Sequence, residues 1–416
     1  MNKVTIISIG DELLIGQTIN TNAAYIGEKL TAIGYDVIRN FTVGDNKDDI
    51  LKTLSDAETI SDFIFITGGL GPTHDDITRN CILEYFQTDM IFDEQTFERI
   101  KKLFEKRNIP MPEINRNQAM VPRIAKVIPN DYGTAPGYDI TKNGKRFFVM
   151  PGVPYEMRGM MENTILPDLK NYIQSKNIFY SQKILYTTGI PESALYTKLE
   201  DIRPLFDEVK VAFLPSQFGV KIRLSMRSND EKFNLEKIKF LEEKIRERVG
   251  DYIYTDEDLP IEEVIGKILT ERKLKLAVAE SCTGGLICHR ITNIPGSSNY
   301  FERGVVSYSN ESKIEILGVN PETIKNFGAV SEQTAIEMAR GVRKISKADI
   351  GISTTGIMGP TGATETKPIG LVFVGYSDSE REFAKQFNFA DNRVRNKDRS
   401  SQAALEILWR ALTGKI

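Results

Sequence analysis

The chain has 416 residues, among them 54 basic and 57 acidic side chains, which give a formal net charge of −3. This near-neutral balance argues against a protein whose main task is to bind nucleic acid or another polyanion. At roughly 100–200 residues per domain, the length predicts two to four domains.

The cysteines and the first residues bear on the cellular compartment. Cys81, Cys282 and Cys288 are too few and too scattered for a disulfide framework, and their odd number indicates a reducing compartment. Met1 leads directly into a strand-like segment, without the basic and apolar regions of a secretory signal. No apolar run approaches the ~20 residues of a membrane-spanning helix. We therefore expect a cytoplasmic protein that is neither exported nor membrane-spanning.

The first region, residues 1–170, alternates short apolar runs such as VTIISIG and DFIFITGG with amphipathic runs such as NTNAAYIGEKLTAIG. This alternation predicts βαβ units on a mainly parallel sheet, with loops at the strand C-termini available for a ligand. The segment RFFVMPGVPYEM (146–157) repeats the pattern, because an apolar strand ends in Pro and Gly before a helix. These residues are predicted to form one α/β domain.

Two further regions follow. Residues 171–258 change to the order strand, helix, strand, strand, helix, which predicts a small α+β module. The acidic segment DEDLP (256–260) is the predicted linker. Residues 259–416 alternate strands and helices again, with SSQAALEILWRALTG (400–414) as the closing helix. The expected fold class is therefore α/β: two α/β sandwich domains with mainly parallel sheets, joined by the α+β module.

A glycine-rich loop, TGGLGPTHDDITR (67–79), follows an apolar strand of the first domain. Gly68, Gly69 and Gly71 would let backbone N–H groups approach a phosphate, although a plain tight turn explains these glycines equally well. The loop is not a Walker loop, because it lacks the Lys-Ser/Thr pair. It is not a dinucleotide-binding fingerprint either, because the third glycine of the GxGxxG pattern is absent.

Acidic residues accompany this loop. Carboxylates beside a phosphate usually imply a divalent cation between them, so we predict metal ligation by Asp75 and Asp76, with His74 as a further candidate. Other candidates for nucleotide binding are Asp11, Glu12 and Asp45. Their alternative roles are those of acids at a helix N-terminus, a cap or a loop.

In the third region, the apolar strand of LAVAESCTGG ends just before Ser281. Ser281 is either a nucleophile beside N–H groups of the turn formed by Thr283, Gly284 and Gly285, or the N-cap of the following helix.

A serine nucleophile requires a base, and the chain contains only two histidines, His74 and His289. His289 follows Ser281 by about two helical turns and should point away from its hydroxyl. A Ser–His–Asp triad is therefore disfavoured, and the remaining base is a lysine whose pKa burial lowers. Lys313, just after the hydroxyl-rich SYSNES, is the best placed.

Motifs in both α/β domains resemble those of the CinA (competence/damage-inducible protein A) family. They are GDELLIGQTINTN, TGGLGPTHDD and MPGVPYEM in the first domain, and AESCTGG, PGSSNYFERG, VSYSNESK, GAVSE and TGIMGPTGATETKPIG in the third. The first domain is also similar to molybdopterin-binding proteins, whose Gly-Gly loop and following Asp match Gly68, Gly69 and Asp76. The resemblance implies an ADP-ribose pyrophosphatase that depends on a divalent metal ion of unspecified identity.

The third domain is similar to nicotinamide mononucleotide deamidases, and this resemblance implies a serine–lysine amidohydrolase without a cofactor. The matching positions are Ser281, Ser298, Tyr308, Lys313, Thr355 and Arg393. We favour Ser298 and Lys313 as the catalytic pair, because Ser298 follows a Pro-Gly turn and lies closer in sequence to Lys313. Ser281 and the Gly284 turn would then hold the substrate, with Ser281 as the alternative nucleophile.

The other matched residues have expected roles in the same site. Tyr308 would relay a proton or pack on the pyridine ring, with a half-buried strand residue as the alternative interpretation. Thr355 would bind the carboxamide or the ribose. Arg393 would anchor the phosphate.

The middle module resembles a KH-type domain, which grips single-stranded nucleic acid with a GxxG loop. The matching turn here is Gly189-Ile190-Pro191-Glu192, with an acid in place of the second glycine. We therefore favour a spacer or dimerisation role, and we expect a homodimer with small nucleotide substrates and without a nucleic-acid or membrane partner. Two rival interpretations are a molybdopterin-like ligand-binding protein and a DNA-uptake or repair accessory protein.

Overall fold

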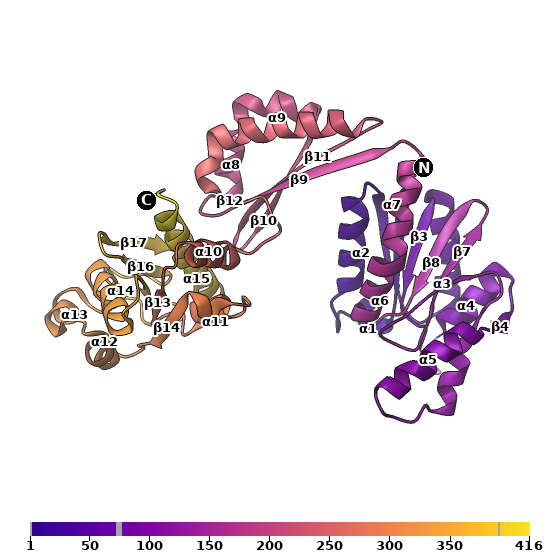
Figure 1. Cartoon of the computed structure of the whole chain (residues 1–416), viewed down its shortest axis with the longest axis horizontal. Coiled ribbons are helices and arrows are strands. Elements are labelled where there is room, and N and C mark those ends of the chain that lie inside the picture. Colours follow the sequence, from indigo (N-terminus) through magenta and orange to yellow (C-terminus); the bar gives the residue numbers. More distant parts are fainter. Residues whose placement is uncertain (1, 72–76, 390–391) are drawn as a thin grey trace. The chain divides into compact units, whose positions relative to one another are not determined.

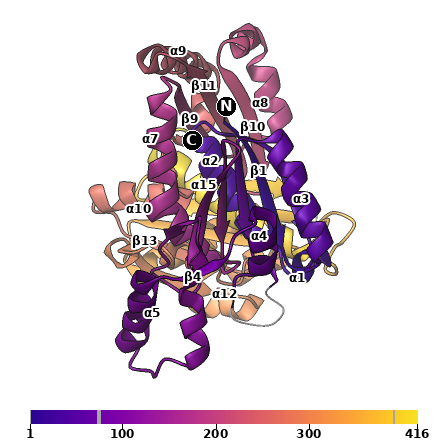
Figure 2. The same ribbon diagram turned by 90° about the vertical axis from the view of Figure 1, so that its right-hand side faces the viewer.

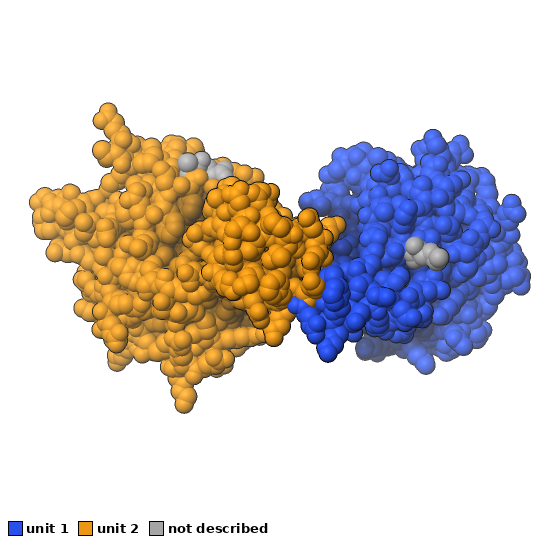
Figure 3. Space-filling view, turned by 90° about the horizontal axis from the view of Figure 1, so that it is seen from above, with its two compact units in different colours: residues 1–181, 226–236 blue, residues 182–225, 237–416 orange. Residues whose placement is uncertain are grey.

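The computed structural model describes residues 2–71, 77–389 and 392–416. The chain divides into two compact units, Met1–Ser181 with Met226–Glu236 and Gln182–Ser225 with Lys237–Ile416 (Figure 3). No described helix combines the length and apolar character needed to cross a membrane.

The first unit is built on a six-stranded sheet with the order β2-β1-β3-β8-β7-β6. Its parallel strands are β1 (Lys3–Ile9), β2 (Asp36–Val43), β3 (Phe63–Thr67) and β8 (Lys145–Met150). The antiparallel strands β7 (Gly137–Lys142) and β6 (Lys126–Ile128) extend one edge. The short strands β4 (Met90–Phe92) and β5 (Met120–Pro122) form a separate pair. The predicted mainly parallel sheet is confirmed.

Helices cover both faces of this sheet, which explains why every residue of β3 is buried. One face packs on α2 (Thr21–Ala32), α6 (Pro154–Met160), the π-turn η2 (Met161–Ile165) and α7 (Leu166–Ser175). The other packs on α3 (Lys47–Ile60) and α4 (Thr78–Phe86) (Figures 1 and 2). The remaining helices of the unit are α1 (Asp11–Leu14), α5 (Glu94–Lys106) and η1 (Glu113–Ala119).

The middle module has the predicted order of elements and one further short strand. The strands are β9 (Phe179–Thr187), β10 (Lys210–Ser216), β11 (Gly219–Ser228) and β12 (Ile253–Thr255), in the sheet order β10-β11-β9-β12. The helices are α8 (Glu192–Lys198), η3 (Glu200–Asp207), α9 (Glu231–Val249) and η4 (Gly250–Tyr252).

The predicted linker, residues 256–260, is held against this module. The Asp256 carboxylate lies 2.7 Å from Lys183 Nζ, and the Tyr186 hydroxyl donates to the Asp258 carboxylate at 2.6 Å. The segment is therefore packed rather than a free spacer.

The last domain has the sheet order β14-β13-β15-β16-β17. Its strands are β13 (Leu276–Glu280), β14 (Phe301–Val306), β15 (Ile350–Gly356), β16 (Leu371–Ser377) and β17 (Glu382–Asn388). The helices α10 (Ile261–Glu271), α11 (Leu286–Thr292) and α15 (Arg393–Leu412) share one core cluster, and α12 (Asn310–Leu317) and α14 (Glu332–Ser346) share the other. Shorter elements are η5 (Ser297–Asn299) and α13 (Pro321–Phe327). Because β14, β13 and β15 are parallel, the segments after all three strands meet at one edge.

Candidate active sites

Ser281 is the first residue after the buried strand β13. Its backbone N–H donates to the Thr354 carbonyl oxygen at 3.0 Å, which continues the pairing with β15 beyond the end of β13. Only 8 % of the side chain is exposed. The strand therefore holds this hydroxyl in a fixed, largely dehydrated position.

Lys313 reaches the same point from α12, whose N-cap Ser309 accepts a hydrogen bond from the Ser312 N–H. The lysine is 1 % exposed, and its Nζ lies 3.0 Å from Ser281 Oγ. The amine also donates to the carbonyl oxygens of Ser307, at 3.0 Å, and Tyr308, at 3.2 Å. The structure thus brings a buried amine into hydrogen-bond contact with Ser281.

Burial lowers the pKa of the Lys313 ammonium, and the negative charge of Glu311 opposes this effect. A neutral amine has two N–H donors and one lone pair. The carbonyls of Ser307 and Tyr308 can accept from both donors, which leaves the lone pair for the Ser281 hydroxyl. These contacts fit a neutral amine whose lone pair faces the Ser281 hydroxyl.

Ser298 is not part of this contact. It lies exposed in the 3₁₀ segment η5 after the Pro-Gly turn. Within the described chain, Lys313 Nζ bonds to Ser281 Oγ and to three carbonyl oxygens, none of which belongs to Ser298. The expected contact between Ser298 and Lys313 is therefore not found, because η5 precedes β14, whereas Ser281 and α12 follow the C-terminal ends of the parallel strands β13 and β14.

The turn after Ser281 differs from expectation in its hydrogen bonding. The fully buried Glu280 carboxylate accepts the N–H groups of Gly285 at 2.9 Å, Ile287 at 3.1 Å and Cys288 at 2.8 Å. The Gly284 N–H donates to the Ser281 carbonyl at 3.2 Å. Two of the three predicted turn donors are therefore already in use.

This arrangement also excludes the N-cap interpretation of Ser281. Helix α11 begins after Gly285, and the Glu280 carboxylate, not the Ser281 hydroxyl, takes up its first N–H groups. Glu280 is a site residue that sequence reasoning missed. Its signal was an acid at the end of an otherwise apolar strand.

Tyr308 and Arg393 form the outer part of the site. One Arg393 N–H group donates to the Tyr308 hydroxyl at 3.2 Å and another to the Gly359 carbonyl at 2.9 Å. Tyr308 is 63 % exposed, so the half-buried alternative was wrong. The structure thus brings two of the predicted site residues together, Tyr308 and Arg393 at the start of α15.

Two threonines of β15 make buried or partly buried hydroxyl contacts. The buried Thr355 hydroxyl donates to the Ala329 carbonyl at 2.7 Å, so only its lone pairs remain for a ligand. The hydroxyls of Thr283 and Thr354 lie 2.7 Å apart.

Lys397, which sequence reasoning also missed, lies near the turn that follows Ser281. A Cβ added to Gly284 would be 3.5 Å from the Lys397 Nζ. Lys397 stands one helical turn after Arg393.

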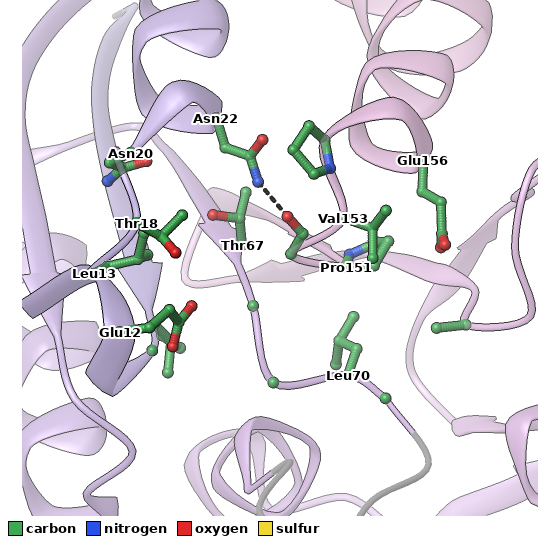
Figure 4. Close-up of a pocket in the computed structure, with 18 of the residues that line it drawn as sticks. Glu12, Leu13, Thr18, Asn20, Asn22, Thr67, Leu70, Pro151, Val153 and Glu156 are labelled. Carbon is green, nitrogen blue, oxygen red and sulfur yellow. Dashed lines mark hydrogen bonds between the residues drawn. The ribbon is translucent and has the colours of Figure 1, made fainter. Parts of the chain in front are cut away.

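A second candidate site is a cavity of about 460 Å³ in the first unit (Figure 4). The loops after β1, β2, β3 and β8 line it, at the C-terminal ends of parallel strands. In the sheet order β2-β1-β3, the strands that follow β1 in the chain lie on opposite sides of it, so the strand order switches between β1 and β3. Open α/β sheets bind ligands at such a switch point. The predicted residues that line the cavity are Glu12, Asp45, Gly68, Gly69 and Gly71.

The glycines are needed for the backbone of this loop. Gly68 has a φ of 109° and Gly69 a φ of 65°, and a Cβ on Gly68 would clash with the Ile9 carbonyl oxygen. Asp11 instead joins two loops. Its carboxylate accepts the Asp45 N–H at 3.1 Å, and the Asp45 carboxylate accepts the Asp11 N–H at 3.1 Å.

The predicted metal ligands His74, Asp75 and Asp76 lie outside the described residues. Within the described ranges, no three His, Cys, Asp or Glu side chains are grouped so that they could hold a metal ion. Glu12 and Asp45 offer carboxylate oxygens to the cavity, and so does Glu156, which sequence reasoning did not single out.

The turn of the middle module that matches a GxxG loop is occupied by contacts. Thr188 Oγ1 accepts a hydrogen bond of 3.0 Å from Gln402 of α15, and Ile190 is 7 % exposed. A Cβ on Gly189 would clash with the carboxylate of Glu406, also on α15. This turn therefore packs against the last helix of the same unit.

Known proteins match nearly the whole chain. The "probable molybdopterin binding domain" matches residues 5–171, the "damage-inducible protein CinA KH domain" matches 182–255, and the "CinA C-terminal domain" matches 258–412. A CinA-like protein of Chloroherpeton thalassium is 45% identical over 412 residues, with 97% of each chain covered. A relative from Caldicellulosiruptor saccharolyticus, which carries the name of a competence-damage inducible protein, is 44% identical over 407 residues. The match covers 98% of this chain and 98% of the relative.

Two similar solved structures are shorter than this chain. The CinA protein of Thermoplasma acidophilum is 36% identical, covers 39% of this chain and 96% of its own, and has a TM-score of 0.37. A competence/damage inducible protein of Agrobacterium tumefaciens is 39% identical, covers 38% and 99%, and has a TM-score of 0.36. With relatives that are more than 40% identical over nearly the full length, the chain belongs to the CinA family.

Proposed function

We propose that the last domain is an amidohydrolase with Ser281 as nucleophile and Lys313 as base, and that it converts nicotinamide mononucleotide into nicotinate mononucleotide and ammonia. The main support is the buried Lys313 amine, 3.0 Å from Ser281 Oγ with two carbonyl acceptors for its own N–H groups. The substrate itself is inferred from the resemblance of the motifs.

The proposed reaction is an acyl transfer. Ser281 Oγ attacks the carboxamide carbon while its proton moves to the Lys313 amine. The C–N bond then breaks, and the lysine ammonium returns the proton to the departing ammonia. Water attacks the resulting ester with Lys313 again as proton acceptor, which releases the carboxylate product and restores the serine. General-base assistance of this kind contributes roughly 10²–10⁴-fold.

The surrounding residues suit a nucleotide substrate. Of the three turn donors, the Thr283 N–H is the one left for the developing oxyanion, and such a donor contributes about 3–4 kcal/mol. Arg393 and Lys397 supply two cations for the phosphate. Tyr308, exposed beside Arg393, offers a ring for the pyridine.

Separate replacement of the two serines tests this assignment. We expect Ser281→Ala to abolish ammonia release from nicotinamide mononucleotide, measured with a chelator present. Ser298→Ala is the matched control and should retain turnover within about threefold. Near-full activity of Ser281→Ala would overturn the assignment, and loss of activity in Ser298→Ala alone would restore the rival nucleophile.

We also propose that the first domain hydrolyses ADP-ribose to AMP and ribose 5-phosphate with a divalent metal ion. The support is the cavity at the reversal point of the sheet, which combines close glycine backbone with the carboxylates of Glu12 and Asp45. Carboxylate oxygens are suitable ligands for such an ion, which would neutralise the pyrophosphate charge when bound. Release of AMP that stops on chelation and returns with added metal would support the proposal. Tight molybdopterin binding without any turnover would favour the rival ligand-binding function.

A further inference from the structure

We propose that Glu156 is the general base of the N-terminal cavity and accepts the proton of the water that attacks the pyrophosphate. This inference rests on the proposed pyrophosphatase function. Glu156 lies in the segment MPGVPYEM, and neither the glycine loop nor the candidate metal ligands account for an acidic side chain at this position.

Glu156 is placed by the start of helix α6, directly after the loop that closes one side of the cavity. The residue is 9 % exposed, yet it lines the cavity. Figure 4 shows it on the opposite side of the Thr67–Leu70 segment from Glu12. A ligand in the cavity would therefore have carboxylates on both sides.

The carboxylate is held by a second loop. Asn130 Nδ2 donates to Glu156 Oε2 at 2.6 Å and to the Ala135 carbonyl at 2.8 Å. The Asn130 amide oxygen accepts the N–H groups of Tyr132, at 3.1 Å, and Gly133, at 2.9 Å. Asn130 is itself 1 % exposed. One buried amide thus fixes both the loop and one oxygen of Glu156.

The close approach of Gly133 indicates that the carboxylate position is specified. A Cβ on Gly133 would overlap the Glu156 carboxyl group. A helix-capping glutamate would bond to the N–H groups of its own helix, whereas Glu156 accepts a hydrogen bond from Asn130 of another loop. Its other oxygen, Oε1, has no hydrogen-bond partner among the described residues and is the oxygen that would accept the proton of the water.

Several charges surround this group. Burial raises the pKa of the Glu156 carboxyl, while the Asn130 hydrogen bond and the cations Arg107 and Arg99 oppose the shift. Both arginines lie at α5 and donate to the same loop, Arg99 to the Gly133 carbonyl and Arg107 to that of Tyr132. Asp131 neighbours Arg99, and Glu12 and Asp45 line the rest of the cavity. A carboxyl with a raised pKa is a stronger base at neutral pH than an exposed one.

In the proposed step, water displaces the bridging oxygen of the pyrophosphate from one phosphorus. The water oxygen bonds to one phosphorus, and one water proton passes to Glu156 Oε1. The bond between that phosphorus and the bridging oxygen breaks, and the bridging oxygen keeps the electron pair on the leaving phosphate. Glu156 then loses its proton to solvent, and AMP and ribose 5-phosphate remain.

The test is Glu156→Gln, whose side-chain oxygen can still accept from Asn130. We expect AMP release from ADP-ribose to fall by roughly 10²–10⁴-fold while the dissociation constant for ADP-ribose stays within threefold. Glu162→Gln is the matched control: Glu162 follows on the same helical run, bonds to the Tyr25 hydroxyl and lies outside the cavity, so turnover should not change. Glu156→Asp should retain an intermediate rate.

The pH dependence gives a second measurement that needs no variant. Wild-type turnover should fall on the acid side with an apparent pKa above that of an ordinary glutamate, and Glu156→Gln should lack this limb. Undiminished turnover in Glu156→Gln, loss of binding together with turnover, or absence of the acid limb in wild type would each overturn the role of Glu156. Absence of AMP release from the wild-type protein would instead refute the pyrophosphatase itself.

Discussion

At the scale of one residue, Lys313 illustrates how burial lowers the pKa of an amine. Its ammonium is enclosed at the start of α12, and removal from water disfavours the charged form. The neighbouring carbonyls of Ser307 and Tyr308 orient the amine without supplying a negative charge. Two histidines in the whole chain made a lysine base predictable. The partner of that lysine was not predictable.

The pKa of Lys313 has a consequence for stability. Because the folded-state pKa is lowered, the unfolded chain binds more protons below the ordinary lysine pKa, and wild-type stability should decrease as the pH falls through this range. Lys313→Met removes the buried amine, so we expect no deamidation, a higher melting temperature near pH 6 and a smaller difference between pH 6 and pH 9.

Thermal melts at both pH values check this expectation. Lys325→Met is the control, since the Lys325 side chain is 72% exposed on α13. A Lys313→Met protein that melts at a lower temperature than wild type near pH 6 would show that the amine stabilises the fold.

At the scale of elements, local periodicity predicted most strands and helices, and the exceptions have physical reasons. Strand β17 lacks an apolar run, because it is an edge strand whose residues are mostly exposed or half-buried.

The closing helix was predicted from Ser400, whereas α15 begins at Arg393. Its first two turns are charged, and Asn392 caps them by accepting the Arg395 N–H. These missed turns carry Arg393 and Lys397.

The contact between Glu280 and helix α11 provides a prediction at this scale. Glu280→Gln leaves a neutral group in place of the carboxylate that accepts three N–H groups in one buried and two partly buried hydrogen bonds. We expect a loss of about 1–3 kcal/mol in the free energy of unfolding of this domain, because buried donors are left poorly satisfied. Turnover should also fall, since the turn that follows Ser281 is no longer fixed.

Urea unfolding and deamidation rates measure both effects. Glu302→Gln, on the exposed part of β14, is the control and should change neither. Unchanged stability in Glu280→Gln would contradict the role of this carboxylate as the anchor of the turn.

At the scale of the whole molecule, most of the middle module, Gln182–Ser225 and the segment from Lys237 onward, belongs to the same compact unit as the last domain. Besides the bond between Gln402 and Thr188, Tyr254 contacts Trp409 edge-on with ring centroids 6.4 Å apart, and Lys415 donates to the Gly250 carbonyl at 2.8 Å. A cut near Asp258 would break these contacts.

We therefore expect a fragment of residues 259–416 to be less stable than a fragment of residues 182–416. Loss of the buried hydrogen bond of Gln402 alone should lower the free energy of unfolding by about 1 kcal/mol. For fragments of this length, that loss corresponds to a melting temperature about 2–4 °C lower. Melting temperatures of the two fragments measure the difference. Equal values would show that the contacts between the module and α15 add no stability.

The amino-acid sequence by itself determined the α/β class, the α+β module between two larger domains and the glycine loop of the first domain, and it led to the proposal of a lysine as base. These follow from local patterns and from the scarcity of histidine. Only the tertiary structure decided that Lys313 meets Ser281 rather than Ser298 and that Glu156 enters the cavity of the first domain. The physical reason is that parallel strands bring residues from distant segments to one edge of a sheet, so nearness along the chain does not predict contact between side chains.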